Sequence, residues 1–250
     1  MGCKPTVSLW RCGAGARAER QEPLAVFRDM KKTIAYIDGF NLYYGMLQSV
    51  PSCKWLDPVV FVKSLLREDH DVVCVKFFTA RIRPYPHDEH AIARQNLYLQ
   101  ALKAQPSIQV VEGYYNRNKI WLPHTVQKCR DCKDSRNGMA RVMKFDEKRS
   151  DVNLTSALLS DAFRNSAESF VLVTGDSDYI TPVDIVRFEL KKQVLVFNPR
   201  SDRPSDLMYH STYYRNIPRD LPAKCQLPDE VTLANGRTIR RPAAWMPSGS

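Results

Sequence analysis

The carboxylates of Asp176 and Asp178 are the side chains of this sequence best placed to do chemistry. They follow the apolar run 171–174, which is typical of a buried strand, and Gly175 allows a sharp turn as the chain leaves the sheet. In open parallel sheets, ligands bind at the carboxyl edge of the strands. Adjacent like charges repel each other unless they share a cation, so this pair predicts half of a metal site.

A further acidic position, Asp38, ends the first predicted strand at residues 33–37, and Asn41 lies at the start of the helix that follows. The first and fourth strands of a doubly wound sheet are neighbours at the switch point, which would bring Asp38 close to Asp176. The alternative is that Asp38 caps the helix, a common role for aspartate before an apolar run. A cap can also be a metal ligand.

Asp151 supplies another acidic position. Ser150 is the predicted N-cap of a helix that runs to about residue 165, which places Asp151 in the first turn. The helix dipole alone would favour a carboxylate there, but the apolar stripe of the helix predicts that Asp151 points inward. Asp161 lies about 15 Å further along the axis, so we expect it to be structural or to orient other groups rather than to bind the same ion.

The candidate ligands therefore come from three segments whose ends a parallel sheet brings together: Asp38, Asp151, Asp176 and Asp178. Carboxylate oxygens select a hard cation, Mg²⁺ or Mn²⁺. Such an ion polarises a phosphoryl oxygen and generates hydroxide from bound water, which is the chemistry of phosphodiester hydrolysis. We expect Ser177 to orient Asp176 or a water molecule, and Asn41 to hydrogen-bond a ligand or a phosphate.

Strand and helix signals alternate along the chain. The predicted strands are 33–37, 71–80, 108–115, 170–174 and 194–197, with two shorter ones at 119–122 and 141–145. The predicted helices are 40–47, 57–67, 88–104, 150–165, 182–191 and 207–215. This alternation predicts an α/β fold, a three-layer α/β/α sandwich with a Rossmann-like, mostly parallel sheet.

One domain, residues 31–215, is expected between two terminal segments. Residues 1–30 show little apolar periodicity and are predicted to be a disordered tail. Residues 216–250 form a C-terminal extension with a hairpin-like stretch at Asn235 and Gly236.

A cysteine pair, Cys129 and Cys132, lies in an insertion at 123–140. One C-x-x-C pair is at most half of a zinc site, and the other ligands would have to come from His124, Cys53, Cys225 or another chain. A loop with two reduced thiols is the favoured alternative. The 7 cysteines are mostly scattered without a disulfide framework, which indicates a reducing compartment.

The 250 residues carry a formal net charge of +10, and the excess is not confined to the ends. A basic surface around a carboxylate cluster suits a polyanion such as RNA, although a merely soluble basic protein is an equal alternative on charge alone. No apolar run approaches the roughly 20 residues of a membrane span, so we expect a cytoplasmic protein without a membrane partner.

Basic and aromatic residues near the predicted carboxyl edge would contact phosphates and stack unpaired bases. The basic ones are Arg81, Arg83, Lys148 and Arg149. The aromatic ones are Tyr43 and Tyr44, which are expected to be partly packed on their helix. A solvated rim is the alternative for the whole set.

Three segments resemble the signature segments of NYN-domain proteins in the PIN-like nuclease superfamily, with most likeness to the LabA-like branch. They are DGFNLY at 38–43, EKRSDV at 147–152 and TGDSDY at 174–179, and the likeness extends over about residues 32–200. The resemblance implies a PIN-like sandwich and a metal-dependent ribonuclease site. Matched residue by residue, it implies these site residues: Asp38, Asn41, Asp151, Asp176 and Asp178.

The sequence therefore predicts an Mg²⁺- or Mn²⁺-dependent endoribonuclease that acts on single-stranded or structured RNA. The alternative from another class is a non-catalytic RNA-binding or regulatory protein that uses the same fold. A phosphatase of small phosphoesters fits least, because Gly39 and Phe40 follow Asp38 where a spaced second aspartate is needed. A homo-oligomer is compatible with the sequence, which does not specify one.

Overall fold

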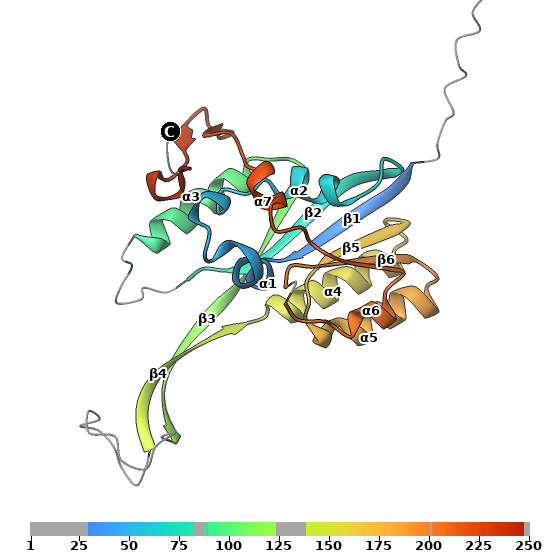
Figure 1. Ribbon diagram of the computed structural model, residues 1–250, viewed down its shortest axis with the longest axis horizontal. Coiled ribbons are helices and arrows are strands. Elements are labelled where there is room, and N and C mark those ends of the chain that lie inside the picture. Colours follow the sequence, from blue (N-terminus) through green and yellow to red (C-terminus); the bar gives the residue numbers. More distant parts are fainter. Residues whose placement is uncertain (1–29, 83–87, 89, 124–138, 201, 248–250) are drawn as a thin grey trace, which may run out of the picture.

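A seven-stranded sheet runs through the computed structural model, with helices on both faces (Figure 1). The structure describes residues 30–82, 88, 90–123, 139–200 and 202–247. The strands are β1 (Lys31–Asp38), β2 (His70–Ala80), β3 (Ile108–Pro123), β4 (Met139–Lys148), β5 (Ser169–Val173), β6 (Gln193–Asn198), β7 (Tyr213–Asn216), β8 (Glu230–Thr232) and β9 (Thr238–Arg240).

The strand order in the large sheet is β4-β3-β2-β1-β5-β6-β7. All the neighbouring pairs are parallel except β3 and β4, which are antiparallel. The chain reverses its direction of travel across the sheet between β1 and β5, so these two strands form the switch point of a doubly wound fold. The predicted α/β sandwich is confirmed.

The α-helices are α1 (Gly39–Leu42), α2 (Pro58–Leu65), α3 (Ala91–Lys103), α4 (Ser150–Phe163), α5 (Ile180–Asp184), α6 (Leu207–His210) and α7 (Leu221–Lys224). Turns of π-helix extend α1 through Tyr43–Leu47 and α5 through Ile185–Glu189. Among the described residues, none of the helices has both the length and the apolar character of a membrane span.

Side chains of β1 alternate between two cores, one on each face of the sheet. Ala35 and Ile37 pack with α2 and α3, whereas Ile34 and Tyr36 pack with α4 and α5. Figure 1 shows the same division, with α1, α2 and α3 on one side of the sheet and α4, α5 and α6 on the other. All four of these β1 side chains are buried, so the strand is fixed on both faces.

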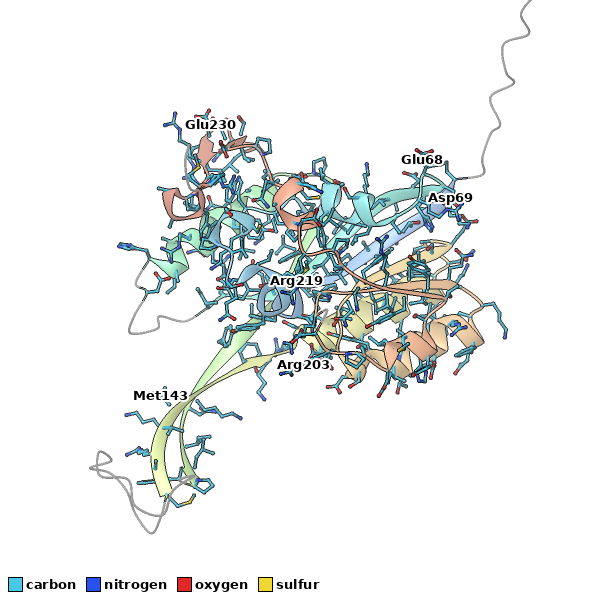
Figure 2. The ribbon with its side chains drawn as sticks, viewed as in Figure 1. Glu68, Asp69, Met143, Arg203, Arg219 and Glu230 are labelled. Atoms are coloured by element: carbon cyan, nitrogen blue, oxygen red, sulfur yellow. The ribbon has the colours of Figure 1, made fainter. Side chains whose placement is uncertain are left out.

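The predicted strands at 119–122 and 141–145 are confirmed, but 119–122 is continuous with 108–115 in β3, which pairs with β4 in one long ribbon that extends away from the sheet and carries Met143 (Figure 2). Two other local predictions were wrong. The predicted helix 207–215 ends at His210, because Tyr213 and Tyr214 pair with β6 as the added strand β7. Ser150 is already helical, and the N-cap is Arg149 in a left-handed conformation with φ 80°.

The segment after β7 packs on the α2 and α3 side of the sheet. Its Cys225, Leu227 and Ile239 belong to the same core as those helices, and the ring of Trp245 lies 6.3 Å from that of Trp55. The hairpin expected at Asn235 and Gly236 is the β8–β9 pair.

Two predicted segments lie outside the described residues, namely most of the 1–30 tail and the insertion with Cys129, Cys132 and His124. Cys53 and Cys225, the other cysteines considered for zinc, are buried free thiols.

Asp161 joins α4 to the sheet by a buried ion pair. Its Oδ2 is 2.5 Å from Nζ of Lys76 on β2 and accepts a hydrogen bond of 2.5 Å from the hydroxyl of Tyr36 on β1. Both charged side chains are about nine-tenths shielded from water, with 15% and 13% exposed. Each group therefore depends on the other for the solvation it lost on folding.

We expect Asp161→Ala to lower the free energy of unfolding by about 3–5 kcal/mol, because it leaves the Lys76 ammonium buried without its partner. Equilibrium urea unfolding measures this loss. Glu189→Ala, which removes an exposed carboxylate on the same face, is the control and should change stability by less than about 0.5 kcal/mol. Equal effects of the two variants would show that the ion pair is not structural.

Candidate active site

Three of the four predicted acidic residues line one cavity at the carboxyl edge of the sheet. Asp38 is the last residue of β1, Asp151 is in the first turn of α4, and Asp176 follows β5. All three border a cavity of about 930 Å³. β1 and β5 are parallel neighbours paired up to Ile37 and Val173, so their carboxyl ends lie side by side.

Asp178 lies elsewhere. Its side chain is exposed and is not among those that line the cavity. Its backbone N–H donates to Oδ1 of Asp176 over 3.1 Å, so Asp176 caps the short 3₁₀ turn Ser177–Tyr179. Ser177 is also exposed, at the start of that turn. This arrangement uses the backbone of Asp178 to hold Asp176 in place, and leaves the Asp178 carboxylate in solvent.

Asp38 is both a helix cap and a cavity residue. Its Oδ1 accepts the backbone N–H groups of Phe40 (3.1 Å) and Asn41 (2.9 Å), and its Oδ2 accepts the hydroxyl of Thr174 (3.2 Å). The capping role considered from the sequence is therefore present. The Thr174 contact also fixes the end of β1 to the end of β5.

Asn41 makes a second link between the two strand ends. Its Oδ1 accepts the backbone N–H of Gly175 over 3.1 Å, and Asn41 also lines the cavity. Gly175 is needed for space, because a Cβ at that position would lie 2.2 Å from Oδ1 of Asn198. The sharp turn predicted at Gly175 is thus a close approach between the ends of β5 and β6.

The cavity concentrates negative charge. The pKa of the Asp38 carboxyl is raised to about 6, chiefly by burial and also by the nearby charges of Asp151 and Asp176, against the opposing hydrogen bonds from the Asn41 backbone N–H and the Thr174 hydroxyl. The hydroxyl of Tyr179 donates to Oδ1 of Asp151 over 2.8 Å. Burial and then the surrounding carboxylates raise the pKa of Tyr179, which therefore remains a donor.

The carboxylate oxygens of this cavity suit a hard cation that is bound directly by only one or two protein ligands. Within the described part of the chain, no three His, Cys, Asp or Glu side chains are arranged as a metal-binding cluster. Mg²⁺ is usually held by one or two carboxylates together with water and substrate phosphates. Asp151 and Asp176 each use Oδ1 in the hydrogen bonds described above, which leaves Oδ2 of each as the oxygen for such an ion.

None of the predicted basic residues that the structure describes lines the cavity of the carboxylates. The guanidinium of Arg81 forms an ion pair with Glu112, with Nε 2.5 Å from Oε2. Arg149 is exposed, with its guanidinium 4.8 Å from the centre of the Tyr114 ring, and Lys148 is exposed at the end of β4. Arg83 lies outside the described residues.

Other residues of the site were not predicted from the sequence. Thr174 and Tyr179, which donate hydrogen bonds to Asp38 and Asp151, lie within the segment 174–179, in which only the acidic residues and Ser177 were given roles. The remaining cavity wall includes the expected Tyr43 and Tyr44, together with residues from the turn before α2, from α3, from β3 and from the C-terminal segment: Lys54, Arg94, Gln95, Tyr98, Tyr115 and Trp245. No local sequence signal marks this second group, because only tertiary packing brings it to the cavity.

Asp38 makes the stability of the protein depend on pH. Because its pKa is raised from about 4 to about 6, the folded protein binds more protons than the unfolded chain in this range, and stability falls as pH rises through it. In EDTA, we expect Asp38→Asn to raise the free energy of unfolding by about 1–3 kcal/mol at pH 7.5 and to have little effect at pH 4. The amide keeps an acceptor for the helix cap.

Urea unfolding across pH measures this effect, and Asp178→Asn is the matched control because its carboxylate is exposed. That control should show less than about 0.5 kcal/mol of change at either pH. An Asp38→Asn variant that is destabilised at pH 7.5 would contradict the charge concentration described above.

Comparison with known proteins identifies the family. The chain matches the NYN domain over residues 32–217, without singling out the LabA-like branch. It is 29% identical over 242 residues to the 6-hydroxy-3-succinoylpyridine 3-monooxygenase HspA of Pseudomonas putida, which covers 86% of this chain and 75% of that protein. Among solved structures, it is similar to VPA0982 of Vibrio parahaemolyticus, a protein of unknown function, with 18% identity, coverage of 80% and 98%, and a TM-score of 0.46. Because the domain match spans most of the chain, this protein belongs to the NYN-domain family of the PIN-like nuclease superfamily.

Proposed function

We propose that the protein is a metal-dependent endoribonuclease that hydrolyses phosphodiester bonds of RNA with Mg²⁺ or Mn²⁺. The observation that carries this proposal is the convergence of Asp38, Asp151 and Asp176 on one cavity, where the pKa of Asp38 is raised to about 6. Without a cation, the fold gains nothing from placing these carboxylates together. A divalent cation would offset the repulsion and lower the pKa of Asp38.

In this proposal, Asp151 and Asp176 bind the ion through Oδ2, and the nearby negative charge of Asp38 stabilises the ion without coordinating it. Asp38 is less suited to direct coordination, because its two oxygens already accept hydrogen bonds from three protein groups. Tyr179 fixes the rotamer of Asp151, and the backbone of Asp178 fixes that of Asp176. The bound ion would polarise the phosphoryl oxygen and supply hydroxide from water.

The cavity wall supports a single-stranded polyanion as the substrate. Tyr44 is 52% exposed and borders the cavity together with Tyr43 and Tyr115, and tyrosine rings stack unpaired bases with little sequence preference. Lys54 and Arg94 lie on the same wall and would contact phosphates. A protein that binds RNA through this wall without cutting it is the alternative.

Cleavage of a labelled single-stranded RNA by the purified protein tests the proposal. We expect cleavage with Mn²⁺ or Mg²⁺ and none with EDTA. Asp176→Asn and Asp151→Asn should each slow cleavage by about 10²–10³-fold, because each removes a group that stabilises developing charge. Asp178→Asn is the matched control, with an identical change two residues away, and should slow cleavage by less than about threefold.

Each other outcome has a distinct meaning. RNA binding without cleavage under every condition would favour the non-catalytic alternative. An equal loss in Asp178→Asn and Asp176→Asn would show that the exposed carboxylate acts at the site, and would contradict the proposed ligand set.

A second candidate is hydroxylation of a small aromatic acid, the kind of substrate in the name of the Pseudomonas putida relative. The observation in its favour is the aromatic wall of the cavity, where Tyr98, Tyr115 and Trp245 lie near the cationic Lys54 and Arg94. Such a wall suits a planar ring that carries a carboxylate.

Incubation with 6-hydroxy-3-succinoylpyridine, oxygen and a reduced nicotinamide tests this candidate. Loss of the pyridine with matching oxidation of the nicotinamide would support it. An unchanged pyridine, alongside metal-dependent RNA cleavage by the same preparation, would exclude it.

A further inference from the structure

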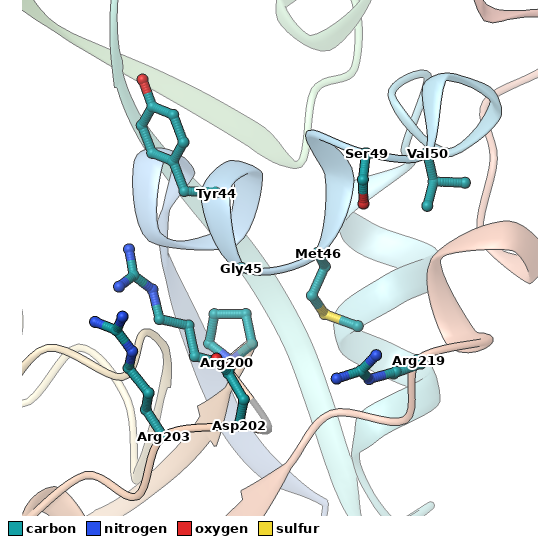
Figure 3. Close-up of a pocket in the computed structure, with 10 residues that line it drawn as sticks. Tyr44, Gly45, Met46, Ser49, Val50, Arg200, Asp202, Arg203 and Arg219 are labelled. Atoms are coloured by element: carbon teal, nitrogen blue, oxygen red, sulfur yellow. The ribbon is translucent and has the colours of Figure 1, made fainter.

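A second, smaller cavity adjoins the acidic one and is lined by arginines (Figure 3). Its volume is about 400 Å³, and Arg200, Arg203 and Arg219 contribute to its wall. The guanidinium groups of Arg200 and Arg203 lie at one side of the cavity, toward Tyr44, and the side chain of Arg219 extends from the opposite side. Arginines from two separate segments of the chain therefore face a common space.

The backbone that carries Arg200 and Arg203 is held by a buried side chain. Asn198, the last residue of β6, accepts the Arg200 N–H through Oδ1 over 2.8 Å. Its Nδ2 donates to the carbonyls of Arg200 (3.0 Å) and Arg203 (2.9 Å). Asn198 is fully buried, so this turn is anchored to the end of the sheet.

The same turn is pressed against the helical segment that follows β1. A Cβ at Gly45 would lie 3.1 Å from atoms of Pro199 and Arg200, so glycine permits this contact. The positions of Arg200 and Arg203 thus depend on two fixed elements of the fold, the end of β6 and the π-helical turn after α1. Both arginines are therefore held in place at the carboxyl edge.

The charged residues of the cavity favour an anion. Among its described lining residues, three are arginines and one, Asp202, is acidic, so positive charge is in excess. Nε of Arg200 is buried without a hydrogen-bond partner among the described residues. A buried donor without an acceptor is costly, and a phosphate oxygen would satisfy it. The planar fork of arginine matches phosphate geometry.

The two cavities share part of their walls. Arg200 and Tyr44 border both of them, so an anion in the arginine cavity lies next to the acidic cavity. A chain of phosphodiesters supplies such neighbouring anions. With a divalent cation held by the carboxylates of the acidic cavity, the two cavities would suit different phosphates of one strand.

We propose that Arg200, Arg203 and Arg219 form a binding site for a backbone phosphate of RNA, adjacent to the phosphate at the acidic cavity. This inference rests on the proposed function for the identity of the strand, and on the arginine geometry for the binding of phosphate. A terminal 5′-phosphate has the same chemistry and is the other source that the experiment must separate.

The test measures RNA binding in EDTA on an Asp176→Asn background, so that it does not depend on cleavage. We expect Arg203→Gln/Arg219→Gln to weaken the binding of a 5′-hydroxyl 12-mer by about tenfold or more. One lost phosphate contact on a single strand should also reduce the slope of log K against log salt by about 0.7. Fluorescence anisotropy across a salt series gives both quantities.

Arg67→Gln/Arg164→Gln is the matched control, because it removes the same charge from two exposed arginines. Arg164 follows the last turn of α4, the end remote from Asp151. Glu68 and Asp69, the neighbours of Arg67, lie at the opposite end of the sheet from Arg203 and Arg219 (Figure 2). This control should change affinity by less than about threefold and leave the salt slope within about 0.3 of the parent.

A parallel measurement with a 5′-phosphorylated 12-mer separates the two sources. Equal losses for both RNAs support a backbone phosphate. A loss confined to the 5′-phosphorylated RNA, or a loss no larger than that of the control variant, would overturn the proposal. Arginine-dependent binding without any cleavage by the unmodified protein would keep this site and reject the nuclease, so the two failures are distinguishable.

Discussion

The parallel pairing of β1 with β5 forces carboxylates together at the centre of the molecule. Asp38 ends a strand that is buried on both faces, so its charge cannot move into solvent, and Asp176 follows the adjacent strand. The fold reduces the resulting repulsion with hydrogen-bond donors from Thr174 and Tyr179 and from the backbone. These donors do not cancel the charge, since the pKa of Asp38 remains raised. The remaining imbalance is the physical reason for the cation proposed at this edge of the sheet.

The same local chemistry that ends each strand also positions its carboxylate. Asp38 and Asp176 are both N-caps, of α1 and of the 3₁₀ turn after β5. An extended residue before a helical turn presents its side chain to the first free N–H groups of that turn. In this fold the helical turns follow the strands, so these caps lie at the carboxyl edge of the sheet. At Asp176 the cap bond uses Oδ1 and leaves Oδ2 for the proposed ion, whereas at Asp38 the second oxygen accepts the Thr174 hydroxyl, so the cap is the role that the structure supports there.

The sequence was sufficient to predict those features that depend on local interactions or on the alternation of strands and helices along the chain. The β1 and β5 runs, the acidic residue after each, and Asp151 in the first turn of α4 belong to this class. Asp178 does not, because a carboxylate two residues after Asp176 points in or out according to the turn between them. The long β3–β4 ribbon, β7 and the packing of Trp245 on Trp55 depend on partners distant in sequence, so no local pattern could indicate them. The arrangement of Arg200 and Arg219 around one cavity likewise depends on contacts between segments distant in sequence.

The division of the carboxyl edge into two cavities of opposite charge bears on which substrate the fold serves. A small aromatic acid would fill only the larger cavity, with its ring on the aromatic wall and its carboxylate on Lys54 or Arg94. It would leave the arginine cavity empty and the buried Nε of Arg200 without an acceptor. In the proposed binding mode, a phosphodiester strand would place one phosphate against each cavity and pass Tyr44 and Arg200, which border both. Because a polyanion would use every charged feature of this edge, the arginine cavity favours a phosphodiester strand over a small aromatic acid as the ligand of the proposed site.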